Sequence, residues 1–304
     1  MTASNPPRDE PRVHRDNPAD LSLADPSASD LSTADLSAAH LLNSISSRLA
    51  GQLRLVAPPG RRRPAPPALV LVAHGSRDPS ALSTVRALMD RVRQLRPGLP
   101  LHLGHIELNE PLLPDTLAAL GDTPAVLVPL LLGRGYHVKQ DIPEMAAASP
   151  VRARVAAPLG PHPLLVEALH ARLTEAGWPP AMDDTDRRST AVVLAAAGSR
   201  DPDSAADTRR TARLLAARLD VPVVPAYASA ASPTVPTALR ALASRGRHRV
   251  AVASYFTAPG RFATQCADQA PWIASAPLGA HDAMARLILH RYDQSLSTRS
   301  TEAA

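Results

Sequence analysis

ALVLVAHGSRDP, residues 68–79, returns almost unchanged as AVVLAAAGSRDP at residues 191–202. Each stretch begins with a short continuous apolar run, which is typical of a strand buried on both faces, and ends in a polar turn with a proline. One ionisable position differs, because His74 of the first stretch corresponds to Ala197 of the second. The comparison indicates a duplicated fold in which one copy has lost a titratable side chain.

Three more pairs of similar segments follow in the same order in both halves of the chain, which a tandem duplication explains and chance does not. They are LHLGHIELNEPLL (101–113) with VPVVPAYASAASPTV (221–235), VLVPLLLGRGYHVKQ (126–140) with VAVASYFTAPGRFATQ (250–265), and APLGPH (157–162) with APLGAH (276–281).

Short apolar runs alternate with segments of helical periodicity from residue 68 onward. The runs at 68–73, 101–108, 125–132 and 154–159 predict strands, and the segments after Asp78, Glu110, Tyr136 and Pro161 predict helices. Buried strands that alternate with helices favour a parallel sheet. We therefore predict the α/β class, with two tandem units that are each a small parallel sheet with helices on both faces.

Composition divides the chain further. The first residues are rich in Pro, Asp, Ser and Arg and offer few large apolar groups to offset the entropy of ordering. The predicted organisation is a disordered N-terminal tail (1–65), a first unit (66–178) that carries the active site, a linker (179–189), a second, degenerate unit (190–293) and a C-terminal tail (294–304).

The totals exclude several classes of protein. Cys266 is the only cysteine among 304 residues, so the chain alone forms no disulfide, iron–sulfur cluster or zinc ribbon. The formal charge of +5 comes from scattered arginines, and aromatic residues are few, so we expect no nucleic-acid partner. No stretch is apolar enough to span a membrane, and the N-terminus lacks the core of a secretory signal. We expect a cytoplasmic protein with no membrane association.

Three ionisable residues of the first unit fall at or just beyond the carboxyl ends of predicted strands, where parallel sheets bind ligands. His74 follows the first strand, Glu107 ends the second, and His137 lies where the loop after the third strand enters a helix. The second unit has lost all three together, since the corresponding residues are Ala197, Ser229 and Phe262.

Two imidazoles and a carboxylate form a ligand set for Fe, Co, Ni or Zn, and the same groups accept protons near neutral pH. Taken singly, each of the three is more often a structural loop residue or a helix cap. His105 lies on the same strand face as Glu107, one pleat deeper, and we interpret it as a core or supporting residue.

HGSRDP, IELNEPLL and PLLLGRGYHVKQDIPE, in that order and spacing, resemble the CbiX-type sirohydrochlorin chelatases, members of the class II tetrapyrrole chelatases. The GxHVxxDIP pattern at residues 135–143 is the most specific of these motifs. The resemblance covers the first unit almost completely and the second unit in degenerate form, or about three quarters of the chain.

The resemblance implies a lyase that inserts Fe(II) or Co(II) into sirohydrochlorin, for sirohaem or cobalamin biosynthesis, without ATP or any cofactor beyond the metal substrate. By position, His74 and His137 would be the paired catalytic histidines that hold the metal and receive pyrrole protons, and Glu107 the assisting acidic residue. Ser76, Arg77, Arg134 and Lys139 would bind the substrate, the cations by pairing with its peripheral carboxylates. We expect a monomer, with a homodimer as the alternative.

Three other interpretations remain. A non-catalytic carrier of metal or tetrapyrrole would use the same ligands without turnover. A non-haem iron oxygenase would use two histidines and one carboxylate, and His105 and Glu107 have the usual spacing on one strand, but the βα repeat argues against its scaffold. A phosphatase with a histidine nucleophile would require arginine directly before HG, where this chain has Ala73.

Overall fold

The computed structural model describes residues 65–302, with side chains described as far as residue 297, so the predicted tail at 1–65 falls outside the described part except for its last residue. The first half follows the predicted alternation of strands and helices. Its elements are β1 (Ala68–Ala73), α2 (Pro79–Leu95), β2 (Leu101–His105), α3 (Leu113–Ala119), β3 (Ala125–Pro129), the π-helix η1 (His137–Asp141), α4 (Ile142–Ala147), β4 (Ala153–Val155) and α5 (Pro163–Glu175).

The second half begins with one additional short helix and then repeats this order without counterparts of η1 and β4. Its elements are α6 (Asp184–Ser189), β5 (Thr190–Ala196), α7 (Pro202–Leu219), β6 (Val223–Tyr227), α8 (Val235–Ala243), β7 (Arg249–Tyr255), α9 (Arg261–Ala267) and α10 (Asp282–Glu302). Two segments differ from the sequence-based expectation. The residues predicted as a linker contain α6, and α10 runs nine residues past the predicted end of the second unit, from 293 to 302.

The strands form two parallel sheets, ordered β2-β1-β3-β4 in the first half and β6-β5-β7 in the second. The predicted α/β class with two tandem sheets is therefore confirmed. The repeated SRDP stretch has the same local role in each half, because Asp78 and Asp201 cap the helices that begin at the following proline. The C-terminal ends of β1 and β5 thus lead into equivalent tight loops.

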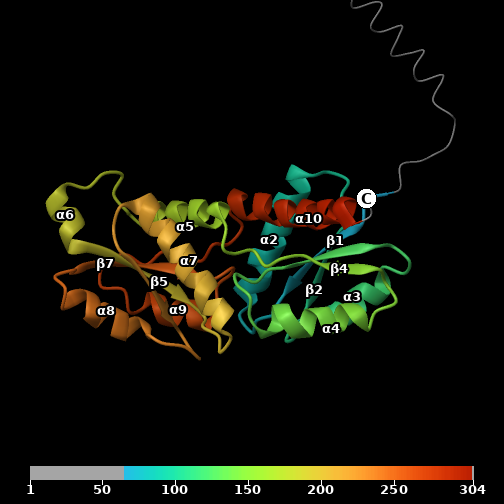
Figure 1. Cartoon of the computed structure of the whole chain (residues 1–304), viewed down its shortest axis with the longest axis horizontal. Helices are drawn as coiled ribbons and strands as arrows, with labels where there is room; N and C mark the ends of the chain where they lie inside the picture. Colours follow the sequence, from blue (N-terminus) through green and yellow to red (C-terminus); the bar gives the residue numbers. More distant parts are fainter. Residues whose placement is uncertain (1–64, 303–304) are drawn as a thin grey trace, which may run out of the picture. The chain divides into compact units, whose positions relative to one another are not determined.

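The last helix of each half packs against the other half. Helix α5 contacts α7 and β7 of the second half, whereas α10 contacts α2 and β3 of the first. Figure 1 shows the same arrangement, with α5 beside α7 and α10 beside α2. The halves are consequently not separate units that each cover both faces of their sheet with their own helices.

This exchange produces one apolar core common to both halves. Buried side chains of β1 and β3, such as Leu71 and Val128, join those of β5, α5, α7 and α10 in a single cluster. Two smaller clusters lie on the opposite sheet faces, one in each half. Polar contacts fasten α10 to the first half, since the Tyr292 hydroxyl donates to the Pro67 carbonyl at 2.7 Å and Arg96 pairs with Asp293 through both carboxylate oxygens.

Two equivalent glycines fix the loops after β1 and β5. Gly75 has φ +103° and Gly198 has φ +92°, and a Cβ at either would lie 1.9 Å from a carbonyl oxygen, that of Glu107 or that of Ser229. Only glycine accommodates both the positive φ and the close approach. The two loops therefore have the same construction, although only the first follows His74.

We expect Gly75→Ala and Gly198→Ala to lower the free energy of unfolding by similar amounts, about 2 to 4 kcal/mol, because each adds backbone strain and a steric clash. Gly98→Ala is the matched control, since Gly98 has φ +81° but nothing within 4 Å of the added Cβ. It should cost only about 1 kcal/mol from strain. Urea denaturation of the three variants measures the difference, and equal costs for all three would contradict the steric argument.

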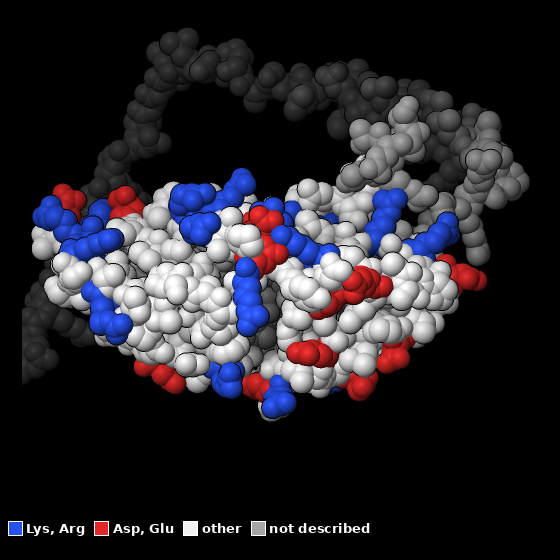
Figure 2. Space-filling model, turned by 60° about the horizontal axis from the view of Figure 1, so that its bottom comes forward, with Lys and Arg blue, Asp and Glu red and all other residues white. Residues whose placement is uncertain are grey.

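The outer surface carries charges of both signs. On the face shown in Figure 2, basic and acidic side chains are interspersed and stand next to one another along its middle. None of the helices within residues 65–302 combines the length and the apolar character needed to cross a membrane.

Candidate functional site

His74 and Glu107 meet at the carboxyl ends of neighbouring strands. Since β1 pairs with β2, the Glu107 backbone N–H donates to the His74 carbonyl at 3.0 Å just beyond the last strand residues. The side chains then approach each other, with His74 Nδ1 at 3.5 Å from Glu107 Oε1. A carboxylate facing Nδ1 favours the proton on that nitrogen and leaves the Nε2 lone pair free for a metal or a proton.

His137 reaches the same place from the third strand of the sheet. It is the first residue of η1, and its ring lies with its centroid 4.7 Å from that of His74, at an interplanar angle of 88°. The structure thus brings together the three residues that sequence analysis selected from three separate loops. A π-helical turn at this point is itself typical of functional sites.

Asp141 belongs to the GxHVxxDIP pattern but is not among the predicted site residues. Its Oδ2 lies 2.5 Å from His137 Nδ1, one helical turn away. This contact orients the imidazole and, like Glu107 at His74, leaves Nε2 as the free nitrogen. The spacing of four residues between a histidine and an aspartate in a helix is the signal that would have identified it.

The site is open rather than closed around a cage of ligands. The side chains of His74, Glu107 and His137 are 41%, 54% and 36% exposed. Between residues 65 and 297 no three His, Cys, Asp or Glu side chains are arranged to hold a metal ion together. Two oriented imidazoles beside a carboxylate can instead take up a metal from solvent, release it to a ligand and accept protons.

His105 lies apart from this group. It is 2% exposed, and its Nδ1 donates to the Pro111 carbonyl at 3.1 Å. Burial lowers the pKa of its imidazole, so the ring is neutral at pH 7. The hydrogen bond supports the turn after β2, which agrees with interpreting His105 as a supporting residue.

Ser76 and Arg77 lie in the loop after His74. The Ser76 hydroxyl oxygen accepts from the Asp78 N–H at 3.1 Å, and the Ser76 N–H donates to Asn109 Oδ1 at 2.7 Å. Ser199 makes the first of these bonds in the second half, so the loop shape accounts for it. Arg77 is exposed, and within the described residues it has no ion pair, which leaves it available to an anionic ligand.

Arg134 and Lys139, which are predicted to bind substrate carboxylates, each lie against carboxylates of the second half. Arg134 forms a bidentate ion pair with Asp207, and Lys139 Nζ lies 2.7 Å from Asp201 and 2.8 Å from Asp203. These hydrogen bonds raise the pKa of both cations. Because protein carboxylates already neutralise them, we assign the two cations to contacts between the halves.

The second half has no ionisable residue at the positions of the three site residues. Its Ser229 hydroxyl donates to the Ala197 carbonyl at 3.1 Å, across the same strand ends that hold Glu107 and His74. Phe262 occupies the position of His137 and stacks with Arg261. The backbone of the site is therefore repeated without its chemistry.

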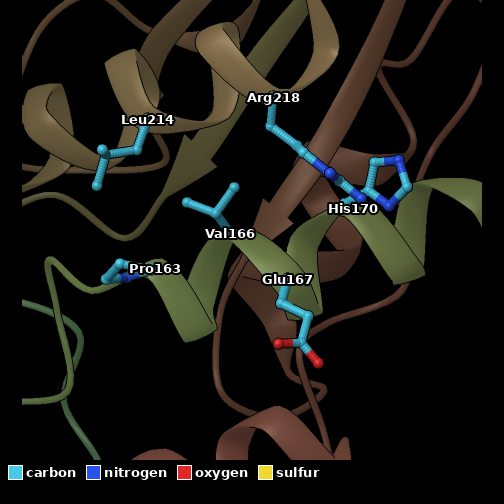
Figure 3. A pocket seen from close by; sticks show the side chains of 6 residues that line it. All are labelled: Pro163, Val166, Glu167, His170, Leu214 and Arg218. Atoms are coloured by element: carbon cyan, nitrogen blue, oxygen red, sulfur yellow. The ribbon is translucent and has the colours of Figure 1, made fainter.

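Two pockets of the described structure lie elsewhere. One, of about 450 Å³, is formed between α5 and α7, and its lining side chains are labelled in Figure 3. It contains none of the three site residues. The residues that line it are Pro163, Val166, Glu167, His170, Leu214 and Arg218.

A protein-family model described as CbiX matches residues 68–176 and again residues 191–295. The two matches coincide with the two repeats found in the sequence and with the two sheets of the structure. They cover more than half of the chain.

Similar proteins agree with the family match. A sirohydrochlorin ferrochelatase of Bacillus subtilis is 31% identical over 175 residues, which cover 55% of this chain and 64% of that protein. A sirohydrochlorin cobaltochelatase of Methanococcus aeolicus is 35% identical over 81 residues, covering 26% of this chain and 57% of that protein. The chain thus spans less than two thirds of these relatives. A solved structure, SirB from Bacillus subtilis with Fe3+, superposes with a TM-score of 0.62 at 25% identity, over 77% of this chain and 97% of that one.

Proposed function

Because the chain belongs to the CbiX family, we propose that it is a sirohydrochlorin chelatase that inserts Fe(II) or Co(II) into sirohydrochlorin. The observation that supports this most directly is the convergence of His74 and His137, at a centroid distance of 4.7 Å, beside Glu107. Relatives named for iron and relatives named for cobalt both match, so either divalent ion is a proposed substrate.

The proposed reaction replaces two pyrrole protons with one metal ion. The free Nε2 atoms of His74 and His137 present the ion to one face of the macrocycle. Once the ion has passed from them to the pyrrole nitrogens, their released lone pairs accept the two protons that it displaces. Glu107 orients the imidazole of His74, whose Nδ1 it faces at 3.5 Å. Ser76 and Arg77, in the adjoining loop, are proposed to bind the peripheral carboxylates of the substrate. No ATP and no further cofactor enters this reaction.

We propose that all catalysis occurs in the first half, residues 66–178, and that the second half, residues 190–293, is catalytically degenerate. The loss of the three ionisable side chains at Ala197, Ser229 and Phe262 supports this assignment. We further propose that the protein is cytoplasmic. We also propose a monomer, because α5 and α10 are exchanged within one chain and need no second copy to cover the sheets.

The carrier interpretation is less favoured than the chelatase. A storage site gains affinity from a closed set of ligands. The three residues here are exposed by between 36% and 54%, and no three-ligand metal group exists among residues 65–297. Such an open arrangement suits transient binding and release.

An anaerobic absorbance assay tests the function. Sirohydrochlorin is mixed with Fe(II) or Co(II) in the presence and absence of the full chain, and the spectrum of the metallated product is followed. Formation of many equivalents of product per protein, faster than the uncatalysed reaction, would support the chelatase. Saturation at one equivalent would instead support a carrier.

Asp141→Asn should lower kcat by about 10- to 100-fold, because it weakens the contact with Nδ1 that orients the His137 imidazole. The side chain keeps its size, so the melting temperature should change little. Asp115→Asn, at an exposed position in the first turn of α3, is a control for the loss of one carboxylate charge. Equal rates for Asp141→Asn and the control would contradict the proposed role of Asp141.

A further inference from the structure

The loop that leads to His137 is held from the second half of the chain by buried polar groups. Tyr255, at the end of β7, donates from its hydroxyl to the Leu132 carbonyl at 3.1 Å. Asp207, in α7, accepts from the Arg134 backbone N–H at 3.0 Å, from its Nε at 3.0 Å and from its Nη2 at 2.7 Å. Both anchored residues precede His137 in the same loop.

The carboxylate of Asp207 is buried and therefore requires hydrogen-bonding partners. It is 3% exposed, and a carboxylate buried in a helix face is strongly unfavourable unless hydrogen bonds and a countercharge compensate it. All three of its side-chain bonds come from Arg134. The bond from the backbone N–H matters most here, because it fixes the main chain of the loop and not only a flexible guanidinium.

Tyr255 and Asp207 belong to one connected set of polar residues, with Thr211 between them. The Thr211 hydroxyl, which has one proton to donate, lies 3.1 Å from the Tyr255 hydroxyl and 3.1 Å from the Asp207 carbonyl. Gly160 leaves room for the phenol, since a Cβ there would lie 2.5 Å from the Tyr255 hydroxyl oxygen. The set extends without a break from α7 to the loop at Leu132.

The internal repeat shows that this set is specific to the second half. The first half places Thr84, Leu88 and Leu130 where the second half has Asp207, Thr211 and Tyr255. Leu88 and Leu130 are ordinary buried core residues. The half that lacks the ionisable site residues has thus acquired polar groups directed at the loop of the half that retains them.

We propose that Asp207 and Tyr255 are positioning residues for His137, through which the second half holds the catalytic loop of the first. The pairing of Lys139 with Asp201 and Asp203 adds an anchor on the other side of His137. This inference rests on the proposed function in one respect, that the placement of His137 matters because its imidazole handles the metal and a proton.

The test compares Asp207→Asn and Tyr255→Phe with the control Asp293→Asn. The control removes another bidentate ion pair between the halves, the one between Asp293 and Arg96. Asp293 lies in α10 and not in the loop that leads to His137. Hydrogen–deuterium exchange of peptides covering residues 130–141 reports the order of the loop without substrate. Steady-state kinetics with sirohydrochlorin and Co(II) report its function.

We expect Asp207→Asn to speed hydrogen–deuterium exchange of this segment and to lower kcat by about 10- to 100-fold. KM should stay unchanged, because the variant loses a contact that supports the loop and does not lose a contact with the substrate. Tyr255→Phe should act in the same direction, whereas Asp293→Asn should alter neither readout. A change in KM with constant kcat would show that Arg134 binds substrate, which would overturn the inference. Unchanged exchange, or faster exchange with wild-type kcat, would overturn it as well.

A double variant tests whether Asp207 acts through His137. If it does, Asp207→Asn should cause no further loss in a His137→Ala background, since coupled residues are not additive. An undiminished additional loss would contradict the inference. Should the wild-type chain show no turnover, the proposed function fails separately. In that case, hydrogen–deuterium exchange and the ¹⁵N resonances of the His137 ring still test whether Asp207 positions His137. Unchanged resonances in Asp207→Asn would overturn this role.

Discussion

His74→Ala and His137→Ala are each expected to lower kcat for metal insertion by at least about 100-fold, the usual contribution of a positioned acid–base group. The physical reason is that each imidazole has one oriented nitrogen for the metal and for a leaving pyrrole proton. Both side chains are more than a third exposed, so the melting temperature should stay close to that of the wild type. Stopped-flow absorbance with sirohydrochlorin and each metal measures the effect.

The internal repeat supplies matched controls for these variants. Phe262→Ala changes the residue equivalent to His137, and Ser229→Ala the residue equivalent to Glu107, and both should retain the wild-type kcat. The double variant His74→Ala/His137→Ala should lose little beyond either single variant if the imidazoles act together. Comparable losses from Phe262→Ala, or wild-type rates for both histidine variants, would refute the assignment of catalysis to the first half.

A fragment of residues 65–178 is expected not to fold as a monomer. It contains all the proposed catalytic residues, but it lacks α10, which covers α2 and β3, and it exposes the face of α5 that packs on α7. Exposing this part of the common core to water removes part of the hydrophobic stabilisation, which is the largest favourable contribution to folding. Circular dichroism during heating should show no cooperative transition of a monomer, and sedimentation velocity should show association or an expanded chain.

Restoring the missing helix provides the control for the fragment. Residues 281–302 joined to the fragment by a long flexible linker should recover part of the cooperative transition, because they cover the exposed face. A linked segment in which Leu287 and Ile288 are replaced by serine should not, since both side chains are fully buried in α10. A cooperative, monomeric fragment without α10 would contradict the exchange of helices.

Much of the fold was predictable because its determinants are local. The continuous apolar run at 68–73 and the SRDP cap specify a buried strand, a turn and a helix start within a dozen residues, and the repeat supplied the same pattern twice. The site trio was predictable for a related reason. Carboxyl ends of adjacent parallel strands necessarily share one rim, so His74, Glu107 and His137 converge once the strands are placed.

Contacts between elements distant in sequence were not predictable in this way. Arg134 and Lys139 were expected to face a ligand, because a basic side chain beside a loop has no local signal that identifies its partner. The partners lie in α7, more than sixty residues further along the chain. Asp141 was nearer, but its role depends on the π-helical turn that brings it to His137.

The sequence by itself thus determined the parallel α/β repeat, the ionisable trio and its absence from the second half. Only the tertiary structure decided which sheet each last helix covers and which carboxylates hold the loop before His137. The physical reason is that an apolar helix face specifies burial but not the surface that buries it. Two similar sheets offer α5 and α10 similar surfaces, and the choice between them depends on packing of the whole chain.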